Sequence, residues 1–330
     1  VTHPTKAGLK IPQMFEAAIN KELKGLWIIG EDIVQTDPNS AHVIEAMNSL
    51  ELLVVQEIFM SETAKLADVV LPGTTFLEKD GTFTNTERRV QRVNKAAEPL
   101  PGTKPDGVIV TEMMQKLGYD QPIYDADQVL AEVADVVPFF KGITRERLGK
   151  FGLQWPVKED GTDTKILHEK EFKLGKGRLK YFDFKESTEI KNNIKEYPLI
   201  LTTSRVLQHY NAATMTRRTN NLKIVDEDIL LVNPKDANER QLNTGDIARL
   251  YSGRGEVSLK VEVTEKVKEG IVFTTFHFPE HMVNMVTGDG KDEETKCAEY
   301  KVSAVQVQKI SNKFKTEISP ADNQAEVARN

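Results

Sequence analysis

Acidic and amide side chains follow two predicted strands near the start of the chain. Gly30-Glu31-Asp32 comes directly after the apolar run 26–29, and Gln56-Glu57 follows the apolar run 52–55. In an open parallel sheet, ligands bind beyond the carboxyl ends of the strands. A carboxylate there can accept hydrogen bonds from ribose hydroxyls or from the N1–H and N2–H₂ edge of guanine, and the alternative is a set of solvated loop acids. No Gly-x-Gly-x-x-Gly pattern follows a strand, so the common nicotinamide-binding fingerprint is absent from the sequence.

A polar segment, residues 78–91, follows the third predicted strand. It combines Lys79, Arg88 and Arg89 with hydroxyl and amide side chains in a turn-rich stretch. Such a composition suits a phosphate or a polar heterocycle. The alternative, which composition alone favours, is a charged surface hairpin.

A second polar segment, residues 202–218, follows an apolar run in the last third of the chain. Arg205 can form paired hydrogen bonds with a pyrophosphate, and His209 can donate or bridge. No Ser or Asp is placed for a hydrolytic triad. His277 and His281 lie four residues apart, but Pro279 between them argues against a helical zinc pair.

The elements that would position these groups differ between the two ends of the chain. Helical spacing predicts a helix over 13–24, ended by Gly25, and a second helix capped by Ser40. Apolar runs predict strands at 26–29, 52–55 and 69–71, with Ser61 capping a short helix before the third. This order predicts βαβ units and a parallel sheet, and helical patterns return at 106–117 and 127–136.

The last third of the chain is predicted to form a compact barrel. Strands are predicted at 199–202, 229–232, 247–250, 257–263, 271–274 and 302–310. The predicted fold class is therefore α/β, with a partial parallel-sheet domain followed by a C-terminal six-stranded-type β-barrel. We divide the chain into the partial α/β domain (1–150), a connector (151–195), the barrel (196–312) and a flexible tail (313–330).

Composition excludes several classes of protein. The 330 residues have a net charge of −6, which argues against a general nucleic-acid binder. No stretch approaches the roughly 20 apolar residues of a membrane span, and we expect a cytoplasmic location. The single cysteine, Cys297, excludes an intramolecular disulfide and any all-cysteine metal site within these residues. The opening Val1-Thr2-His3-Pro4, without an initiator Met, is expected to be an internal cut.

Several motifs, taken in order, carry a family resemblance. They are residues 30–32, 54–64, 67–72, 78–91 and 105–106 in the first half, and 202–218, Asn284, Thr287 and 299–301 in the second. Together they resemble the molybdopterin oxidoreductases of the dimethyl-sulfoxide-reductase class, and within it the C-terminal part of formate dehydrogenase alpha (catalytic) subunits. The resemblance covers nearly all of residues 8–310 except parts of the connector.

The resemblance implies a bis-molybdopterin guanine dinucleotide (bis-MGD) cofactor with molybdenum or tungsten. It implies a dinucleotide-binding α/β domain whose nucleotide end is lined by Gly30, Asp32, Gln56, Glu57, Lys79 and Asp106. It also implies a molybdopterin dinucleotide-binding barrel, whose pyrophosphate and pterin side is lined by Thr203, Arg205, Val206, Leu207, His209, Phe276, Asn284 and Lys301. Within that set, Arg205, His209 and Lys301 are expected to share one anion.

The resemblance also implies that the catalytic and cluster-binding residues of the family lie outside this sequence. The family's cysteines for a 4Fe–4S cluster, its cysteine or selenocysteine ligand to molybdenum and its active-site Arg have no counterpart here, so no catalytic or metal residue is assigned. The implied partners are the remainder of the catalytic subunit and iron–sulfur or NAD-reducing redox subunits. The implied function is the cofactor-binding C-terminal portion of a formate dehydrogenase, inactive alone. A nitrate reductase of the same family and a non-catalytic nucleotide-binding accessory module remain the alternatives.

Overall fold

A computed structural model describes residues 4–310, and its N-terminal part is built on a parallel sheet. The sheet has the strand order β1-β2-β3, with Trp27 opposite Val54 and Val54 opposite Val69. Its core packs Phe15, Val43 and Leu53 together. The predicted βαβ units and parallel sheet are confirmed. The elements are α1 (Ile11–Ile19), β1 (Gly25–Ile29), α2 (Ile33–Thr36), α3 (Ser40–Asn48), β2 (Leu52–Glu57), α4 (Glu62–Lys65) and β3 (Val69–Pro72).

Two helix boundaries differ from the sequence prediction. The helix predicted over 13–24 ends at Ile19, because Lys21 adopts a left-handed backbone (φ 62°) that cannot continue it. The predicted cap at Ser40 is wrong, since Asn39 precedes the helix and Ser40 is its buried first residue. The predicted cap at Ser61 is confirmed by the hydrogen bond that its side chain accepts from the Ala64 amide.

The C-terminal part is a closed barrel with the strand order β10-β8-β11-β7-β12-β9. Alternate residues of each strand point inward, so that Leu201, Leu230 and Leu250 lie in one core with no exposed surface. All six predicted strands are confirmed. They are β7 (Leu199–Ser204), β8 (Ile229–Val232), β9 (Ile247–Tyr251), β10 (Glu256–Val263), β11 (Ile271–Thr275) and β12 (Ser303–Lys309), with α9 (Pro234–Glu239) between β8 and β9.

Between these two parts in the sequence, the chain forms a small antiparallel sheet. Residues 81–93 form a hairpin, β4 (Gly81–Thr84) and β5 (Arg89–Val93), as the alternative interpretation of that segment predicts. β6 (Leu153–Gln154) pairs with β5, so this sheet extends past residue 150 into the predicted connector. The helices of this part are α5 (Asp106–Lys116), α6 (Ala126–Val136) and α7 (Arg145–Leu148).

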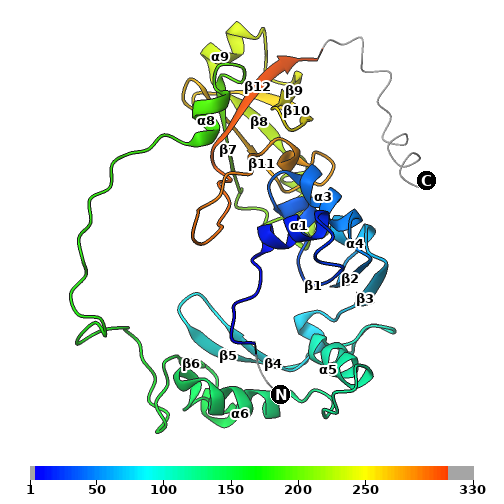
Figure 1. The fold of residues 1–330 in the computed structure, drawn as a ribbon, viewed down its shortest axis with the longest axis vertical. Coiled ribbons are helices and arrows are strands. Elements are labelled where there is room, and N and C mark those ends of the chain that lie inside the picture. The colour runs from blue at the N-terminus through cyan, green and yellow to red at the C-terminus, as the bar shows by residue number, and fades with distance from the viewer. Residues whose placement is uncertain (1–3, 311–330) are drawn as a thin grey trace.

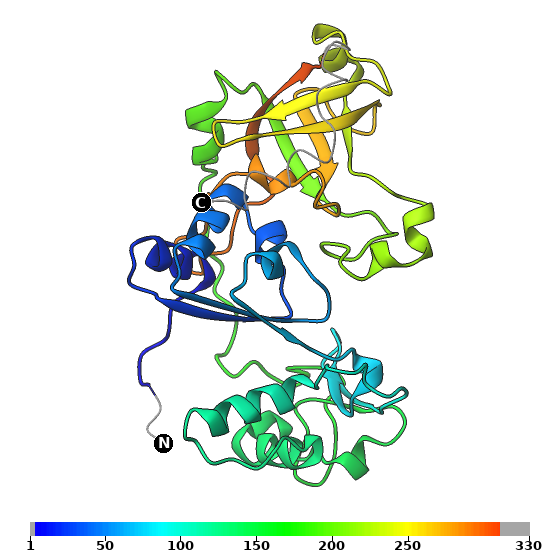
Figure 2. The ribbon, with the colours of Figure 1, turned by 90° about the vertical axis from the view of Figure 1, so that its right-hand side faces the viewer.

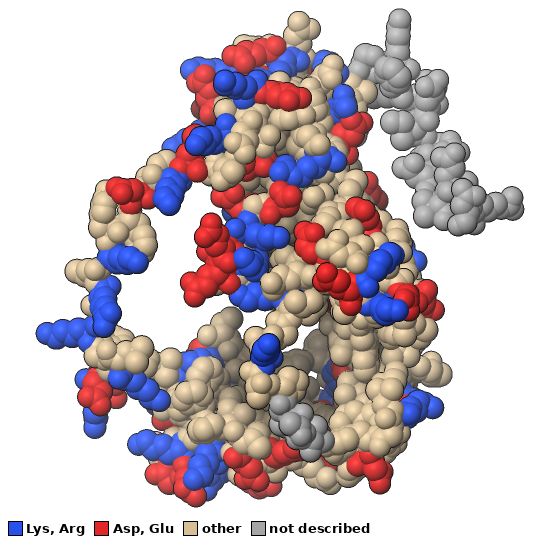
Figure 3. Space-filling model, in the orientation of Figure 1, with Lys and Arg blue, Asp and Glu red and all other residues tan. Residues whose placement is uncertain are grey.

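The three parts are stacked, with the β1–β3 sheet between the barrel and the small sheet (Figures 1 and 2). A long irregular segment runs along one side of the molecule and leads to α8 (Thr188–Asn193) at the barrel. Lys/Arg and Asp/Glu side chains are intermingled on the face drawn in Figure 3. Short 3-10 turns complete the described elements: η1 (Phe76–Glu78), η2 (Pro138–Phe140), η3 (Thr216–Arg218), η4 (Asn220–Lys223) and η5 (Val283–Met285). The predicted tail, 313–330, lies outside the described residues.

None of the helices within residues 4–310 is both long and apolar enough to cross a lipid bilayer.

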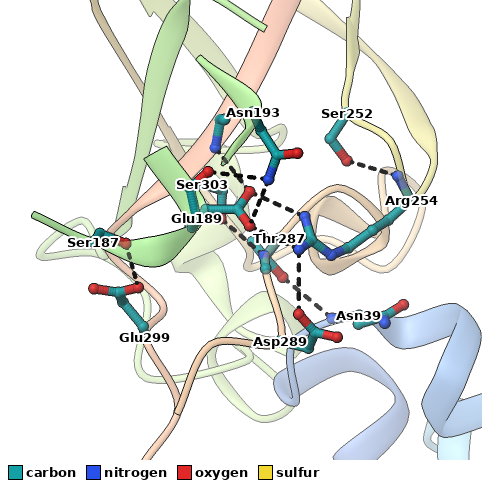
Figure 4. Close-up of polar contacts among 12 residues, drawn as sticks. Asn39, Ser187, Glu189, Asn193, Ser252, Arg254, Thr287, Asp289, Glu299 and Ser303 are labelled. Atoms are coloured by element: carbon teal, nitrogen blue, oxygen red, sulfur yellow. Dashed lines mark hydrogen bonds and ion pairs between the residues drawn. The ribbon is translucent and has the colours of Figure 1, made fainter. Parts of the chain in front are cut away.

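A buried ion pair fastens α8 to the barrel (Figure 4). Arg254, in the turn between β9 and β10, donates to both carboxylate oxygens of Glu189, at 3.0 and 2.7 Å. The same carboxylate accepts from the Ala304 amide of β12 and from the Asn193 side chain. Arg254 also reaches Asp289, so one guanidinium connects α8, a barrel turn and the loop before β12.

Removing Arg254 tests this network. Arg254→Met is expected to lower the free energy of unfolding by about 3 kcal/mol, because it leaves the Glu189 carboxylate buried without a cationic partner. The matched control is Lys235→Met, which removes an exposed ion pair with Glu269 and should cost less than about 1 kcal/mol. Urea denaturation of both variants measures the difference. Equal small losses would contradict a structural role for the buried pair.

Candidate functional site

A cavity of about 920 Å³ lies between the parallel sheet and the barrel. On the sheet side it is lined by the residues that follow β1, β2 and β3, which is where an open parallel sheet binds ligands. On the barrel side it is lined by the loop after β7, by Phe276 after β11, and by Tyr300 and Lys301 before β12. The volume is at the upper end of ordinary small-molecule sites.

The structure brings nine of the predicted site residues to this cavity and leaves five outside its lining. Those lining it are Gly30, Asp32, Gln56, Glu57, Lys79, Asp106, Arg205, Phe276 and Lys301. Those outside the lining are Thr203, Val206, Leu207, His209 and Asn284. Segments separated by more than 200 residues in sequence therefore share one site.

Asp106 is the centre of a polar cluster on the sheet side. It is the first residue of α5, and its carboxylate pairs with the Lys79 ammonium and accepts a hydrogen bond from Gln56 Nε2 at 2.8 Å. Partial burial acts to raise the pKa of Asp106, but the bonds from Lys79 and Gln56 outweigh it and hold the pKa below its usual value. The Asp106 carboxylate therefore stays ionised at neutral pH, and its partner Lys79 also donates to the Thr74 carbonyl.

Two buried polar atoms at this cavity have no partner among the described residues. They are Gln56 Oε1 and Thr74 Oγ1, on side chains that are 1% and 2% exposed. An unpaired buried acceptor or hydroxyl costs free energy unless a ligand or water satisfies it. A heterocycle with ring N–H and amino donors, such as guanine or a pterin, carries the complementary groups. The donor and acceptor set on the sheet side thus fits the cofactor that the resemblance implies.

The carboxylates that line the sheet side differ in how far they are already engaged. Asp32 accepts from the Thr63 amide at 2.9 Å, the Thr63 hydroxyl at 2.7 Å and the Glu62 amide at 3.2 Å, so it fastens the start of α4. Glu57 accepts from a neighbouring amide, that of Ile58. Burial raises the pKa of Glu57, and the charges of Asp32 and Asp106 add to that effect.

The barrel side of the cavity presents two cations that lack carboxylate partners within residues 4–310. The Arg205 guanidinium lies over the Phe276 ring, 5.3 Å from its centroid, and Lys301 donates to the Thr203 carbonyl. Burial lowers the pKa of Lys301, and the charge of Arg205 lowers it further. Two like charges at one cavity repel each other, and an anion bound between them would relieve that repulsion.

Four of the five predicted residues outside the cavity lining form hydrogen bonds with segments beside it. His209 is 4% exposed and contacts the Thr216 hydroxyl and the Val225 carbonyl, at 3.0 and 2.8 Å. Asn284 donates to the Gln35 carbonyl at 2.8 Å, across the junction of sheet and barrel.

The remaining three of the five lie in or beside β7. Thr203 is buried and donates to the Tyr300 carbonyl, which holds the Lys301 segment against the strand. Val206 donates its backbone N–H to His277 Nε2, and the Leu207 side chain is fully exposed.

Two carboxylates, Asp37 and Glu31, lie close enough to influence each other where the sheet domain meets the barrel. Burial and the charge of Glu31 raise the pKa of Asp37 to about 6, with Thr36 acting in the opposite direction. Burial also raises the pKa of the neighbouring Tyr300, with the charges of Asp37 and Glu31 contributing. No cation pairs with Asp37 among the described residues, and such uncompensated carboxylates are concentrated at ligand sites.

Sequence reasoning missed several residues of the site. Tyr300 stood inside the motif 299–301, which gave a signal, whereas Thr74 and Asp37 stood in no pattern that marks a ligand group. Gln35 was also missed, although its Nε2 donates to the Ala212 and Phe276 carbonyls at 3.2 and 3.1 Å and so joins α2 to both barrel loops. Residues 4–310 of the structure contain no cluster of three or more His, Cys, Asp or Glu side chains that could hold a metal ion.

The raised pKa of Asp37 makes a pH-dependent prediction for the cofactor-free chain. The folded state binds this proton more tightly than the unfolded state, so the contribution of Asp37 to stability is present near pH 4 and lost as pH rises through about 6. Asp37→Asn removes the charge, and it should raise the free energy of unfolding at pH 8 by about 2 kcal/mol and leave it unchanged near pH 4. Urea denaturation at both pH values measures this. A variant as stable as the wild type at both pH values would show that the folded state does not destabilise the ionised Asp37 carboxylate.

Comparisons with known proteins agree with this architecture. Residues 2–116 match the family described as molybdopterin oxidoreductase, and residues 199–304 match the molybdopterin dinucleotide binding domain. A solved acetylene hydratase from Pelobacter acetylenicus is similar in fold, with a TM-score of 0.68 at 20% identity over 90% of this chain and 46% of that chain.

Curated relatives are closer in sequence. The chain is 43% identical over 310 residues to the alpha subunit of an F420-dependent formate dehydrogenase from Methanocaldococcus jannaschii. It is 42% identical over 309 residues to the alpha subunit of F420-dependent formate dehydrogenase 2 from Methanococcus maripaludis. These matches cover 92% of this chain but 46% and 45% of the relatives, so the chain spans about half their length. With its two matched domains folded as a parallel sheet and a closed barrel around one cavity, the chain belongs to the molybdopterin oxidoreductase family.

Proposed function

We propose that this chain is the cofactor-binding C-terminal portion of a molybdenum- or tungsten-dependent formate dehydrogenase, which oxidises formate to carbon dioxide. The observation that carries the proposal is the cavity between sheet and barrel. Within residues 4–310, one side offers carboxylates together with an amide oxygen and a hydroxyl that lack partners, and the other side offers two cations without carboxylate partners. Such a site suits a ligand that is a polar heterocycle at one end and an anion elsewhere. A bis-MGD cofactor has both features.

In this proposal the chain's own residues bind and orient the cofactor. Gln56 and Thr74 take up donors of the heterocycle, beside the Asp106–Lys79 pair. Arg205 and Lys301 form charge-assisted hydrogen bonds with the pyrophosphate. When bound, the cofactor supplies a metal that accepts two electrons from the substrate. No residue of this chain is assigned a part in that redox chemistry.

Formate is favoured over nitrate as the substrate because both relatives described above are named formate dehydrogenases. The accessory-module alternative predicts a protein without molybdenum. Analysis of the full-length gene product for molybdenum and guanine, together with formate- and nitrate-dependent dye assays, distinguishes the three. Formate oxidation with bound metal and guanine supports the proposal, nitrate reduction alone overturns the choice of substrate, and a protein free of metal and guanine indicates the accessory module.

The remaining proposals concern partners and location. The relatives are named alpha subunits, so we infer that the remainder of the catalytic subunit and a redox partner subunit complete the enzyme. A 4Fe–4S cluster in that remainder would carry the electrons onward. The name of these relatives makes F420 a candidate acceptor beside an iron–sulfur or NAD-reducing partner. We infer a cytoplasmic enzyme.

The isolated 330-residue chain is expected to show no formate oxidation, because the cluster cysteines, the cysteine or selenocysteine ligand to molybdenum and the active-site Arg that the resemblance implies have no counterpart in its sequence. The measurement is dye reduction by the purified chain supplied with bis-MGD and formate. The intact enzyme, assayed in parallel, is the positive control. Turnover by the isolated chain at a rate near that of the intact enzyme would contradict the assignment of the catalytic groups to another part of the protein.

Lys79→Met tests the nucleotide end of the site in the intact enzyme. Because Lys79 holds Asp106 in place beside Gln56, its removal should speed the loss of guanine cofactor about tenfold, as expected for a charge-assisted hydrogen bond. Lys104→Met is the matched control, since Lys104 pairs with Glu112 on the surface. Guanine content after timed gel filtration measures both. Equal retention in the two variants would remove Lys79 from the site.

A further inference from the structure

The loop after β7 forms much of the barrel side of the cavity but has little regular structure of its own. Residues 205–212 supply Arg205, Tyr210, Asn211 and Ala212 to the lining. Asn211 and the adjacent Ala213 have left-handed backbones, with φ of 48° and 55°. Residues other than glycine adopt this conformation at a cost in free energy, so contacts from outside the loop must hold it.

His277 makes such contacts at both ends of this loop. It follows β11, its side chain has no exposed surface, and its Nε2 lies 3.1 Å from the Val206 amide nitrogen. Its Nδ1 lies 2.7 Å from the Asn211 carbonyl oxygen. A backbone amide can only donate and a carbonyl can only accept, so Nδ1 carries the proton and Nε2 is unprotonated. The ring is therefore a neutral imidazole in one fixed tautomer.

The backbone that carries the imidazole ring is held at both its amide and its carbonyl. Asp228 is buried and accepts from the His277 and Phe278 amides, both at 3.1 Å, and from the Thr275 hydroxyl. Arg217, in η3, donates to the His277 carbonyl at 3.3 Å. These contacts fix the backbone from which the ring reaches the loop.

We propose that His277 is a positioning residue: its neutral imidazole clamps Val206 and Asn211 and so holds the loop 205–212 in the conformation that presents Arg205 and Asn211 to the cavity. The clamp is a property of this chain alone. Its consequence for the cofactor rests on the proposed function.

Protonation of the imidazole would open the clamp. A proton on Nε2 would face the Val206 N–H, placing two donors against each other. Burial lowers the pKa of His277 below the ordinary value of 6.5, with smaller contributions from His209 and Arg205 in the same direction and from Asn211 and Asp228 in the opposite one. The open loop therefore binds the proton more tightly than the closed loop, and opening becomes more favourable as pH falls below about 6.5.

Hydrogen exchange of the 330-residue chain, followed by mass spectrometry, tests the clamp without cofactor. His277→Phe keeps a planar ring but removes both contacts, so exchange of the peptide 205–212 should be about tenfold faster than in the wild type. Exchange in β8, β9 and β10 should not change. His281→Phe, four residues further on, is the matched control, because that ring is hydrogen-bonded to the Ser258 carbonyl and to no part of the loop among the described residues. Unchanged exchange of the loop, or equal acceleration in the barrel strands, would overturn the proposal.

Two further variants separate the contacts and cover the case in which the phenylalanine variant does not fold. The amide of Asn occupies the place of Nδ1 and that of Gln the place of Nε2, so His277→Asn should retain the bond to Asn211 and His277→Gln the bond to Val206. In each of these two variants the exchange rate of the loop should lie between the rates of the wild type and of His277→Phe. In the wild type, loop exchange relative to the intrinsic rate should also rise below about pH 6.5, and all three variants should lack this rise. A pH dependence that persists in the variants would assign it to another group, such as His209.

The second arm uses the intact enzyme and measures the time course of guanine loss. Faster loss from His277→Phe than from His281→Phe links the clamp to the cofactor. Faster loop exchange without faster guanine loss would overturn that link and leave the clamp standing. An intact wild-type protein that contains no guanine would instead overturn the proposed function.

Discussion

Buried hydrogen bonds hold the sheet domain against the barrel, and the cavity lies between the two parts. Gln35 donates from one side-chain nitrogen to the Ala212 and Phe276 carbonyls, and its own carbonyl accepts from Asn284. These contacts are buried, so breaking one leaves a polar group without a partner. The apolar cores of the two units form separate clusters, and Met282, from the segment after β11, packs against the sheet core. The relative position of the two walls of the site therefore depends on this polar junction together with the Met282 contact.

The structure accepts an electrostatic cost at the cavity that it avoids at other buried carboxylates. Asp228 and Glu189, which lie outside the cavity lining, are each matched with donors or a cation. Asp37, by contrast, is held beside Glu31 with its pKa raised to about 6, and no cation pairs with it among the described residues. A protein selected for stability alone would not maintain such a destabilised carboxylate, and its presence at the cavity indicates a binding function.

The sequence was sufficient for the elements but not for the connections between them. Short apolar runs bounded by Gly-rich turns determine the barrel strands, because inward-facing residues must alternate and strand ends need turn residues. Side chains that bind backbone groups follow no such period. The Gln35 amide and the His277 ring act on carbonyl and amide groups of distant loops, and any residue type can supply those groups. His209 illustrates the same limit: its residue type indicates an anion contact, yet its ring serves the Thr216 hydroxyl.

The two walls of the cavity differ in charge, and this difference orients a ligand. Five carboxylates line the sheet side, namely Glu31, Asp32, Asp37, Glu57 and Asp106, whereas Arg205 and Lys301 line the barrel side. Lys79 does not reverse the pattern, because it is paired with Asp106. A ligand whose hydrogen-bond donors and negative charges lie at different positions is therefore bound better in one orientation than in the reverse. Because the loop that carries Arg205 has strained backbone positions, that orientation also depends on the neutral imidazole at position 277.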